Sequence, residues 1–329
     1  MSQRVITYAE AVREAIGQAM EADPSVFMLG EDIGIYGGAF GVSGDLIQRF
    51  GPERIRDTPI SELGIVGAAV GAALVGMKPI VEIQFSDFTA QAMDQIVNQA
   101  AKIHFMLGGE LSVPMVLRAP TGSGTGAAAQ HSQSLESWFA HVPGLKVVMP
   151  SSPYEVKGLL LSALDDPNPV IVLEHKLLYK TSGEVPEEMY RIPIGVSNLV
   201  REGKDLVMVA TGIMVSRCLE AAQELSAIGI DVSVVDVRSL TPLDMGPIED
   251  QIRKTGRVML VQEAPKHVGY MAEIAARISE GPAIYSLLEP IKRVCGMDVP
   301  IPYAPQLEKA VVPQLPGIIS AAQELLRGV

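Results

Sequence analysis

The chain alternates between strand-like apolar runs and helical segments along most of its length, and this alternation constrains the fold more than any other feature. In the first half, apolar runs such as residues 26–29 and 113–118 are separated by segments with helical spacing. The same order returns further along, with strand-like runs that include residues 205–210 and 257–262. Strands separated by helices pair in parallel through right-handed crossovers. The pattern therefore predicts an α/β protein of two domains in series, each a mainly parallel sheet covered by helices.

The boundary between these domains is marked by a change in composition. Between residues 181 and 203 the sequence becomes rich in Pro and Glu and loses its helical period. A length of 329 residues is also too great for one ordinary core. We place the boundary near residue 190, which gives one domain at 1–190 and a second at 191–329.

The net charge and the hydropathy of the chain disfavour several classes of binding partner and a membrane span. A net charge of −12 argues against binding to nucleic acid and against docking on anionic lipid. The longest nonpolar run, residues 63–77, is shorter than the roughly 20 residues of a membrane span and predicts a buried helix. Cys218 and Cys295 lie far apart, without metal or redox spacing, and each is interpreted as a small apolar residue. With no apolar signal-peptide region at the N-terminus, these observations predict a reducing cytoplasm.

The signatures of several common enzyme classes are absent from the sequence. There is no P-loop, no H-E-x-x-H zinc motif and no serine with a glycine both two residues before it and two residues after it, as a nucleophile elbow requires. The stretch Gly124–Ala129 resembles a dinucleotide fingerprint but lacks its third glycine. Nucleotide hydrolysis, zinc hydrolysis and nicotinamide binding are therefore disfavoured.

Glu62 stands at the first turn of an unusually glycine-rich helical segment, after Ser61, whose hydroxyl is placed to cap the helix. Each glycine inside a helix costs about 0.8–1.0 kcal/mol, so we expect this helix to pack closely against another backbone. Burial there would raise the pKa of the carboxyl group unless a cation pairs with it, and a raised pKa suits acid–base work. On the pattern alone, the alternative that Glu62 complements the helix dipole is the stronger one.

Two further residues have polar or aromatic side chains near the ends of predicted strands. His131 follows a Gly/Ala loop, where a histidine is placed for acid–base catalysis, although a surface histidine explains the pattern equally well. Phe88 follows the carboxyl end of a strand, where ligands bind in parallel sheets. Its alternative role is to fill the core.

Several ordered motifs together resemble one family: the β subunits of pyruvate, branched-chain 2-oxo acid and acetoin dehydrogenases. This family is the thiamine-diphosphate-dependent first component of 2-oxo acid dehydrogenase complexes, within the transketolase-like superfamily. The resemblance covers essentially the whole chain. The motifs are Asp57–Glu62 with Gly64–Gly67, Glu82–Phe88, Asp94–Asn98, Ala129–Ser134, Pro143–Val148 and Val237–Asp244.

The resemblance implies a thiamine-diphosphate pyrimidine-binding domain followed by a transketolase C-terminal-like domain. Glu62 matches the catalytic glutamate that hydrogen-bonds N1′ of the aminopyrimidine and promotes its imino tautomer. Phe88 matches the aromatic residue that packs on the pyrimidine, and Ile60 and Gln84 match neighbouring cofactor contacts. His131 matches a catalytic histidine that assists proton transfer or reductive acylation of lipoamide.

The resemblance also implies a monovalent-cation site, with K⁺ as the candidate ion, built largely from backbone carbonyl groups. Hard oxygen ligands of this kind suit such an ion. The matching residues are Met115, Ala163, Leu164, Asp166 and Asn168.

One motif of the family's cofactor chemistry is missing. Enzymes of this kind hold the diphosphate through Mg²⁺ with a Gly-Asp-Gly motif, and the nearest approach in this chain is Gly44-Asp45-Leu46. A separate α subunit is therefore expected to hold Mg²⁺ and the diphosphate. The resemblance implies an α2β2 heterotetramer that docks on a lipoyl-bearing dihydrolipoamide acyltransferase core.

The expected activity is that of an oxidoreductase that decarboxylates a 2-oxo acid on thiamine diphosphate and transfers the acyl group to lipoamide. Trp138-Phe139 is similar to pyruvate enzymes and the stretch 180–188 to acetoin-cleaving ones, so pyruvate or acetoin is favoured over branched-chain substrates. Two rivals are a single-chain ketol transferase, which would need the missing Mg²⁺ motif, and a scaffold subunit without chemistry, which would not need Glu62, Phe88 and His131 together.

Overall fold

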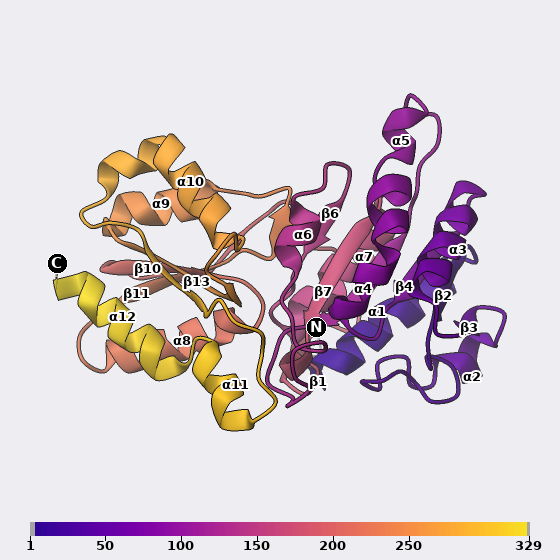
Figure 1. Cartoon of the computed structure of the whole chain (residues 1–329), viewed down its shortest axis with the longest axis horizontal. Helices are drawn as coiled ribbons and strands as arrows, with labels where there is room; N and C mark the ends of the chain where they lie inside the picture. The colour runs from indigo at the N-terminus through magenta and orange to yellow at the C-terminus, as the bar shows by residue number, and fades with distance from the viewer. Residues whose placement is uncertain (1–3, 328–329) are drawn as a thin grey trace. The chain divides into compact units, whose positions relative to one another are not determined.

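The structure, a computed structural model, describes residues 4–327 and divides into two compact units (Figure 1). Unit 1 contains the chain up to Thr121 together with Trp138–Ile194. Unit 2 contains Gly122–Ser137 and the chain from Gly195 onward. The short segment Gly122–Ser137 thus packs with the second unit although it leaves a strand of the first. The boundary near residue 190 stays a prediction.

Unit 1 is built on a parallel sheet with the strand order β6-β7-β5-β4-β2-β3. All of its neighbouring strands pair in parallel, as the alternation of strands and helices predicts. A separate antiparallel pair joins β1 (Arg4–Thr7) to β8 (Ser182–Val185). The sheet strands are β2 (Val26–Gly30), β3 (Ile55–Asp57), β4 (Lys78–Glu82), β5 (Val116–Thr121), β6 (Lys146–Val148) and β7 (Val170–His175).

The helices of unit 1 pack in pairs: α1 lies against α7, and α3 lies against α4 and β4. Thr7 begins α1 with a capping box that it shares with Glu10, and Ser152 caps α7 ahead of Pro153. The helices are α1 (Tyr8–Ala22), α2 (Leu46–Phe50), α3 (Glu62–Leu74), α4 (Thr89–Asp94), α5 (Ile103–Met106), α6 (Glu136–Ala140), which crosses between the units, and α7 (Pro153–Asp165). Single 3₁₀ turns occur at Ser86–Phe88 and Lys176–Leu178.

The segment 90–106 has helical spacing in the sequence, but its helix is interrupted. After α4 it continues as a π-helix at Gln95–Ala100, and only the last turn, α5, is α-helical again. Apolar periodicity separates helix from strand but does not distinguish an α turn from a π turn, which differ by one residue.

Unit 2 contains a five-stranded sheet with the order β14-β13-β10-β11-β9, in which only β9 is antiparallel to its neighbour. Helices α8 and α12 cover one face and α9 and α10 the other (Figure 1). The strands of this sheet are β9 (Asn198–Arg201), β10 (Leu206–Ala210), β11 (Val232–Asp236), β13 (Val258–Pro265) and β14 (Lys292–Gly296), and the short strand β12 (Ser239–Thr241) lies outside it. The helices are α8 (Ile213–Ser226), α9 (Gly246–Thr255), α10 (Met271–Glu280), α11 (Pro305–Val311) and α12 (Leu315–Arg327), with a 3₁₀ turn at Pro282–Ser286.

Helix α3 differs from its sequence-based expectation in two respects. It was expected to be buried, but one side of it is open: Leu63 is 49% exposed and Val75, just after its end, 80%. It was also expected to pack closely on another backbone, yet a Cβ added at Gly71 would meet nothing within 4 Å. The chain's own described residues therefore leave α3 without a neighbour on the side of Gly71, although the helix packs against α4 and β4 elsewhere. Among residues 4–327, no helix is both long and apolar enough to cross a bilayer.

Candidate functional site

The carboxyl ends of β2, β3 and β4 lie side by side in unit 1, because Gly30 pairs with both Asp57 and Glu82. Ligands bind at this edge of open parallel sheets. The segments that leave β3 and β4 there carry the four residues expected to contact the cofactor. These residues are Ile60, Glu62, Gln84 and Phe88.

Glu62 is the first residue of α3 and is only 3% exposed. Ser61 is the N-cap residue, as predicted, but its hydroxyl makes no capping hydrogen bond, so that part of the prediction is wrong. Its backbone angles, φ −164° and ψ 80°, lie outside the usual capping geometry. Across the described residues 4–327, the Glu62 carboxylate has no hydrogen-bond or ion-pair partner.

A second acid, Glu31, lies near Glu62. Glu31 follows β2 directly and is 8% exposed, and its burial, with repulsion from Glu62 and Asp32, raises its pKa. Glu31 was not predicted from the sequence as a site residue. It could have been found by the signal that selected Phe88, since both residues follow the carboxyl end of a buried parallel strand.

The backbone ties the Glu31 loop to the segment that leads into α3. The amide of Gly34 donates to Oδ1 of Asp57 at 2.7 Å, and the amide of Thr58 donates to the carbonyl of Gly30 at 3.0 Å. A Cβ at position 34 would lie 2.3 Å from Oδ2 of Asp57, so only glycine allows this approach. The two buried acids are therefore held on segments that cannot move independently.

Phe88 belongs to a group of aromatic side chains in and near the segment that follows β4. Phe88 meets Phe85 edge to face, with ring centroids 5.6 Å apart, and Phe85 meets Phe40 in the same way at 5.8 Å. The ammonium group of Lys176 lies 5.2 Å from the Phe85 ring centroid. Phe88 is half-buried, so one part of its surface is fixed by Phe85 while another part remains accessible.

Together these groups fit a flat nitrogen heterocycle better than a metal ion. A buried carboxylate without a protein partner can share a proton with a ring nitrogen, and an aromatic ring can stack on the ring face. Gln84, also half-buried, offers an amide that lies 3.4 Å from Oδ2 of Asp32. Ile60 is 82% exposed and so has apolar surface free for contact. Among the described residues, no cluster of three His, Cys, Asp or Glu side chains could hold a metal ion.

His131 lies in unit 2, in the loop that follows β5, whereas Glu62 and Phe88 belong to unit 1. Its side chain is half-buried, and its amide donates to the carbonyl of Ala128 at 3.4 Å. Its catalytic role stays a prediction.

The residues expected to bind a monovalent cation come together around the end of α7. The carbonyl of Met115 accepts from the amide of Val170 at 3.0 Å, and the carbonyl of Ala163 accepts from the amide of Asp166 at 3.3 Å. The Asp166 carboxylate pairs with the ammonium group of Lys146 and accepts from the amide of Asn168 at 2.9 Å. Each carbonyl keeps a second lone pair, but the negative charge of Asp166 already has a cation.

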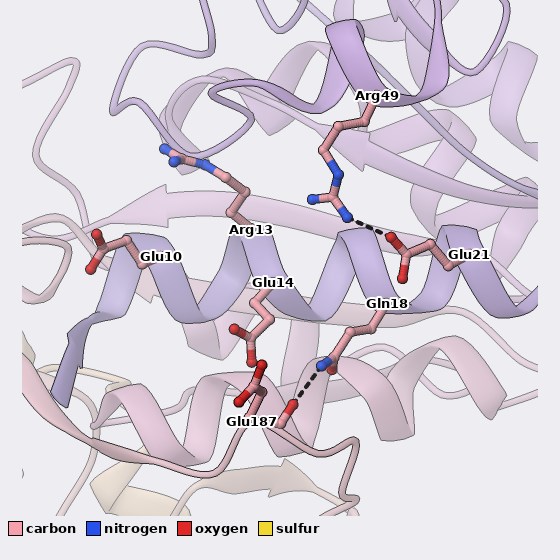
Figure 2. A pocket seen from close by; sticks show the side chains of 7 residues that line it. All are labelled: Glu10, Arg13, Glu14, Gln18, Glu21, Arg49 and Glu187. Atoms are coloured by element: carbon pink, nitrogen blue, oxygen red, sulfur yellow. Dashed lines mark hydrogen bonds and ion pairs between the residues drawn. The ribbon is translucent and has the colours of Figure 1, made fainter. Parts of the chain in front are cut away.

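A polar pocket of about 340 Å³ lies elsewhere in unit 1, along the outer side of α1 (Figure 2). Its groups are engaged with one another: Arg49 pairs with Glu21 at 2.7 Å, and Gln18 donates to the carbonyl of Glu187 at 2.7 Å. Glu14 pairs with Lys157. The pocket is therefore a surface network and contains none of the expected site residues.

Comparisons with known proteins agree with both units. Residues 4–182 match the family described as "Transketolase, pyrimidine binding domain", and residues 195–318 match "Transketolase, C-terminal domain". A solved structure described as "Split gene transketolase, inactive beta4 tetramer" aligns with a TM-score of 0.81 at 25% identity, covering 98% of each chain. The α/β fold expected from the sequence is thereby confirmed.

Curated relatives resemble the chain at higher identity. The β subunit of acetoin:2,6-dichlorophenolindophenol oxidoreductase from Cupriavidus necator is 46% identical, covering 99% of this chain and 98% of the relative. The mitochondrial β subunit of the pyruvate dehydrogenase E1 component from Bos taurus is 45% identical (98% and 90%). The β subunit of 2-oxoisovalerate dehydrogenase from Bacillus subtilis is also 45% identical (98% of each).

These relatives span the three enzymes whose β subunits the sequence motifs resemble, so that resemblance is confirmed. Each aligns along nearly the full length of the chain. The chain belongs to the family of β subunits of pyruvate, acetoin and 2-oxoisovalerate dehydrogenases, with a transketolase pyrimidine-binding domain and a transketolase C-terminal domain.

Proposed function

We propose that this chain is the β subunit of a 2-oxo acid dehydrogenase that decarboxylates its substrate on thiamine diphosphate and transfers the acyl group to lipoamide. Pyruvate is the first candidate substrate and acetoin the second, with branched-chain 2-oxo acids less favoured. The observation that carries the proposal is the Glu62 carboxylate, which is buried without a partner among residues 4–327, at the ligand-binding edge of a pyrimidine-binding domain.

In this proposal, Glu62 holds a proton at N1′ of the aminopyrimidine. A carboxylate with no competing donor keeps its lone pairs for that nitrogen, and its low exposure strengthens the hydrogen bond. Glu31 is the nearby acid, and its pKa is raised by burial and by repulsion from Glu62 and Asp32. Phe88, fixed by Phe85, would pack on the ring, with Ile60 and Gln84 beside it. Thiamine diphosphate, when bound, supplies the carbon nucleophile and the electron sink for decarboxylation.

A partner subunit is part of the proposal. The chain lacks a Gly-Asp-Gly motif for Mg²⁺ and the diphosphate, so an α subunit would provide both. The open side of α3 supports this assembly: Gly71 meets no neighbour within 4 Å, and a Cβ at Gly67 would touch only the side chain of Gln95, at 3.4 Å. Several glycines on one helix are explained if a second chain approaches its backbone closely. We assign the complex the stoichiometry α2β2.

Acyl transfer involves His131 and a lipoyl arm. A loop histidine can take up or release a proton near neutral pH, which reductive acylation of lipoamide requires. The lipoyl arm would come from a dihydrolipoamide acyltransferase core on which the complex docks. A K⁺ ion at the end of α7 and a reducing cytoplasm complete the proposal; both Cys218 and Cys295 are free thiols, which agrees with a reducing compartment.

The test is reconstitution with the α subunit, followed by assays with pyruvate, acetoin and branched-chain 2-oxo acids. Glu62→Gln is expected to lower turnover by about 10²–10⁴-fold, the range for losing a general acid–base group. Glu53→Gln, which changes an exposed carboxylate near β3, is the matched control and is expected to leave turnover unchanged.

Two results would contradict the proposal. Unchanged turnover in Glu62→Gln would favour a scaffold subunit without chemistry. Turnover of a 2-oxo acid by the isolated β chain with Mg²⁺ and thiamine diphosphate would remove the need for an α subunit.

A further inference from the structure

The loop that carries His131 has an unusual backbone. It runs from Gly122 to Gln133, and its ends are joined by a hydrogen bond of 3.1 Å from the Gly122 amide to the Gln133 carbonyl. Such a closed loop is an Ω-loop. Gly124 and Gly126 have φ values of 100° and 68°, and Ala128 follows with 62°. Alternating residues with positive φ turn successive amide groups toward one side and create a concave row of donors.

These amides donate to a carboxylate from a distant part of the sequence. Glu308 on α11 is 4% exposed, and its Oε1 accepts from the Gly124 amide at 2.7 Å. The Gly126 amide lies 3.2 Å from Oε2 and 3.4 Å from Oε1 of the same group. Glu263 on β13 adds a second anchor, because its Oε1 accepts from the Ser123 amide at 2.5 Å. All these residues belong to unit 2.

The charge of Glu308 is compensated by backbone amides alone. Within residues 4–327, Glu308 forms no ion pair with a Lys, Arg or His side chain. The amides in turn have no other acceptor among the bonds described for this loop. Glycine has the largest backbone freedom of any residue, so the Gly124–Gly126 segment would sample many conformations without an anchor. The buried anion and the loop conformation therefore depend on each other.

We propose that Glu308, assisted by Glu263, is a positioning residue for His131. His131 lies five residues beyond Gly126 and inside the same loop, which a hydrogen bond closes, so a change in the Gly124–Gly126 backbone is transmitted to His131 along a short stretch of chain. The proposal rests on the function proposed above for His131 in acyl transfer. It assigns a role to Glu308 and Glu263, which belong to unit 2, whereas Glu31 and Glu62 belong to unit 1.

The test compares Glu308→Ala with Gln306→Ala in the reconstituted α/β complex. Gln306 lies on the same helix but is exposed, so its truncation is a matched control. The first measurement is hydrogen–deuterium exchange of the loop 122–133. Glu308→Ala is expected to speed exchange of the loop amides by about tenfold or more, the change that follows loss of charge-assisted hydrogen bonds.

The second measurement separates the two half-reactions. Lipoyl-dependent acyl transfer is expected to fall by about 10- to 100-fold in Glu308→Ala, the effect of a misplaced catalytic group. Decarboxylation measured with an artificial electron acceptor is expected to stay within about twofold, since it does not need the acyl-transfer histidine. Glu308→Gln keeps one acceptor oxygen without the charge and is expected to give intermediate values for exchange and for acyl transfer.

Three results would contradict parts of this proposal. Unchanged exchange in Glu308→Ala overturns the anchoring, whatever the rates. Faster exchange with normal acyl transfer, in a complex where His131→Ala is impaired, overturns the positioning role. Normal acyl transfer in His131→Ala overturns the function proposed for His131, and with it the catalytic part of this proposal. The exchange measurement still reports separately on the Glu308 anchor in that case.

Discussion

The two units neutralise buried carboxylates in different ways. In unit 1, Arg118 is fully buried and donates to Glu174 at 2.7 and 2.6 Å and to Glu82 at 2.6 Å. The hydroxyl of Tyr179 adds a hydrogen bond of 2.8 Å to Glu174. In unit 2, Glu308 has only the amides of a loop. A fixed side-chain cation compensates charge in the first case, and a backbone conformation does so in the second.

The Arg118 network is therefore a scaffold of the fold, whereas the amides around Glu308 belong to a loop whose conformation can change. Glu82, Arg118 and Glu174 come from β4, β5 and β7, which are neighbours in one sheet, so their network joins three strands near the edge that carries the candidate site. Burial opposes the positive charge of Arg118, but the two carboxylates outweigh it and raise its pKa further. Glu308 and Glu263 of unit 2 instead accept from amides of one loop.

The largest effect is expected from Arg118→Met. This change leaves two carboxylates buried without their cation, so the free energy of unfolding should fall by about 3–5 kcal/mol. Urea unfolding of the chain measures the loss. Adding Glu82→Gln and Glu174→Gln should recover part of it, because the uncompensated charges are then gone. A loss below about 1 kcal/mol would show that the network does not support the sheet.

The next largest effect concerns Glu136, at the start of α6. Burial and repulsion from Glu263 raise the pKa of Glu136 to about 7, and within residues 4–327 its Oε2 has no hydrogen-bond partner. The folded-state pKa exceeds the unfolded value of 4.5, so the stabilisation is complete below pH 4.5 and is lost as the pH rises through 7. At about 1.4 kcal/mol per pKa unit, the loss amounts to about 3 kcal/mol.

The measurement for Glu136 is stability against pH from 5 to 8 for the wild-type chain and Glu136→Gln. The difference in slope isolates the contribution of this one group, whatever constant cost the substitution has. Parallel curves for the two proteins would mean that Glu136 is ionised in the folded chain throughout this range.

A smaller loss of stability is expected from Glu308→Ala, about 1–2 kcal/mol, because two amides lose a charged acceptor. Gly124 is exposed and Gly126 half-exposed, so water can replace the carboxylate in part. Urea unfolding beside Gln306→Ala tests this. If Glu308→Ala cost as much stability as Arg118→Met, the contrast between scaffold and loop would be broken.

The smallest effect is expected for an exposed ion pair in unit 2. Arg253 on α9 pairs with Glu249 at 2.6 Å, and its side chain is 44% exposed. Arg253→Ala should change the free energy of unfolding by no more than about 0.5 kcal/mol, since solvent screens such pairs. Thermal unfolding provides the measurement. A larger change would indicate that α9 depends on its surface charges.

The sequence predicts the layout of the fold because apolar periodicity reports which residues are buried. It places β2 and β10 to within about one residue and predicts the parallel pairing, both of which follow from local pattern and chain connection. It does not predict the π-helix at Gln95–Ala100 or the missing hydrogen bond of Ser61, since both depend on backbone angles that many sequences share.

The candidate site is predicted in part for the same reason. Glu62 and Phe88 could be proposed from the sequence because they lie in motifs and follow recognisable elements. Glu31 escaped because a single acid after a strand is common, and Glu308 escaped because its partners lie 184 and 182 positions away in the chain. Contacts of such long range leave no periodic trace in one sequence.

The placement of Glu62 on α3 has a thermodynamic consequence. The residue proposed to hold the cofactor's proton and the glycine face proposed to meet a partner belong to one short helix, Glu62–Leu74. If partner docking orders that helix, docking and cofactor binding share a coupling free energy, and linkage is reciprocal. Thiamine diphosphate should then raise the affinity between the subunits by the same factor by which assembly raises the affinity for the cofactor. The dissociation constant of the subunit complex would therefore report how fully the cofactor site is occupied.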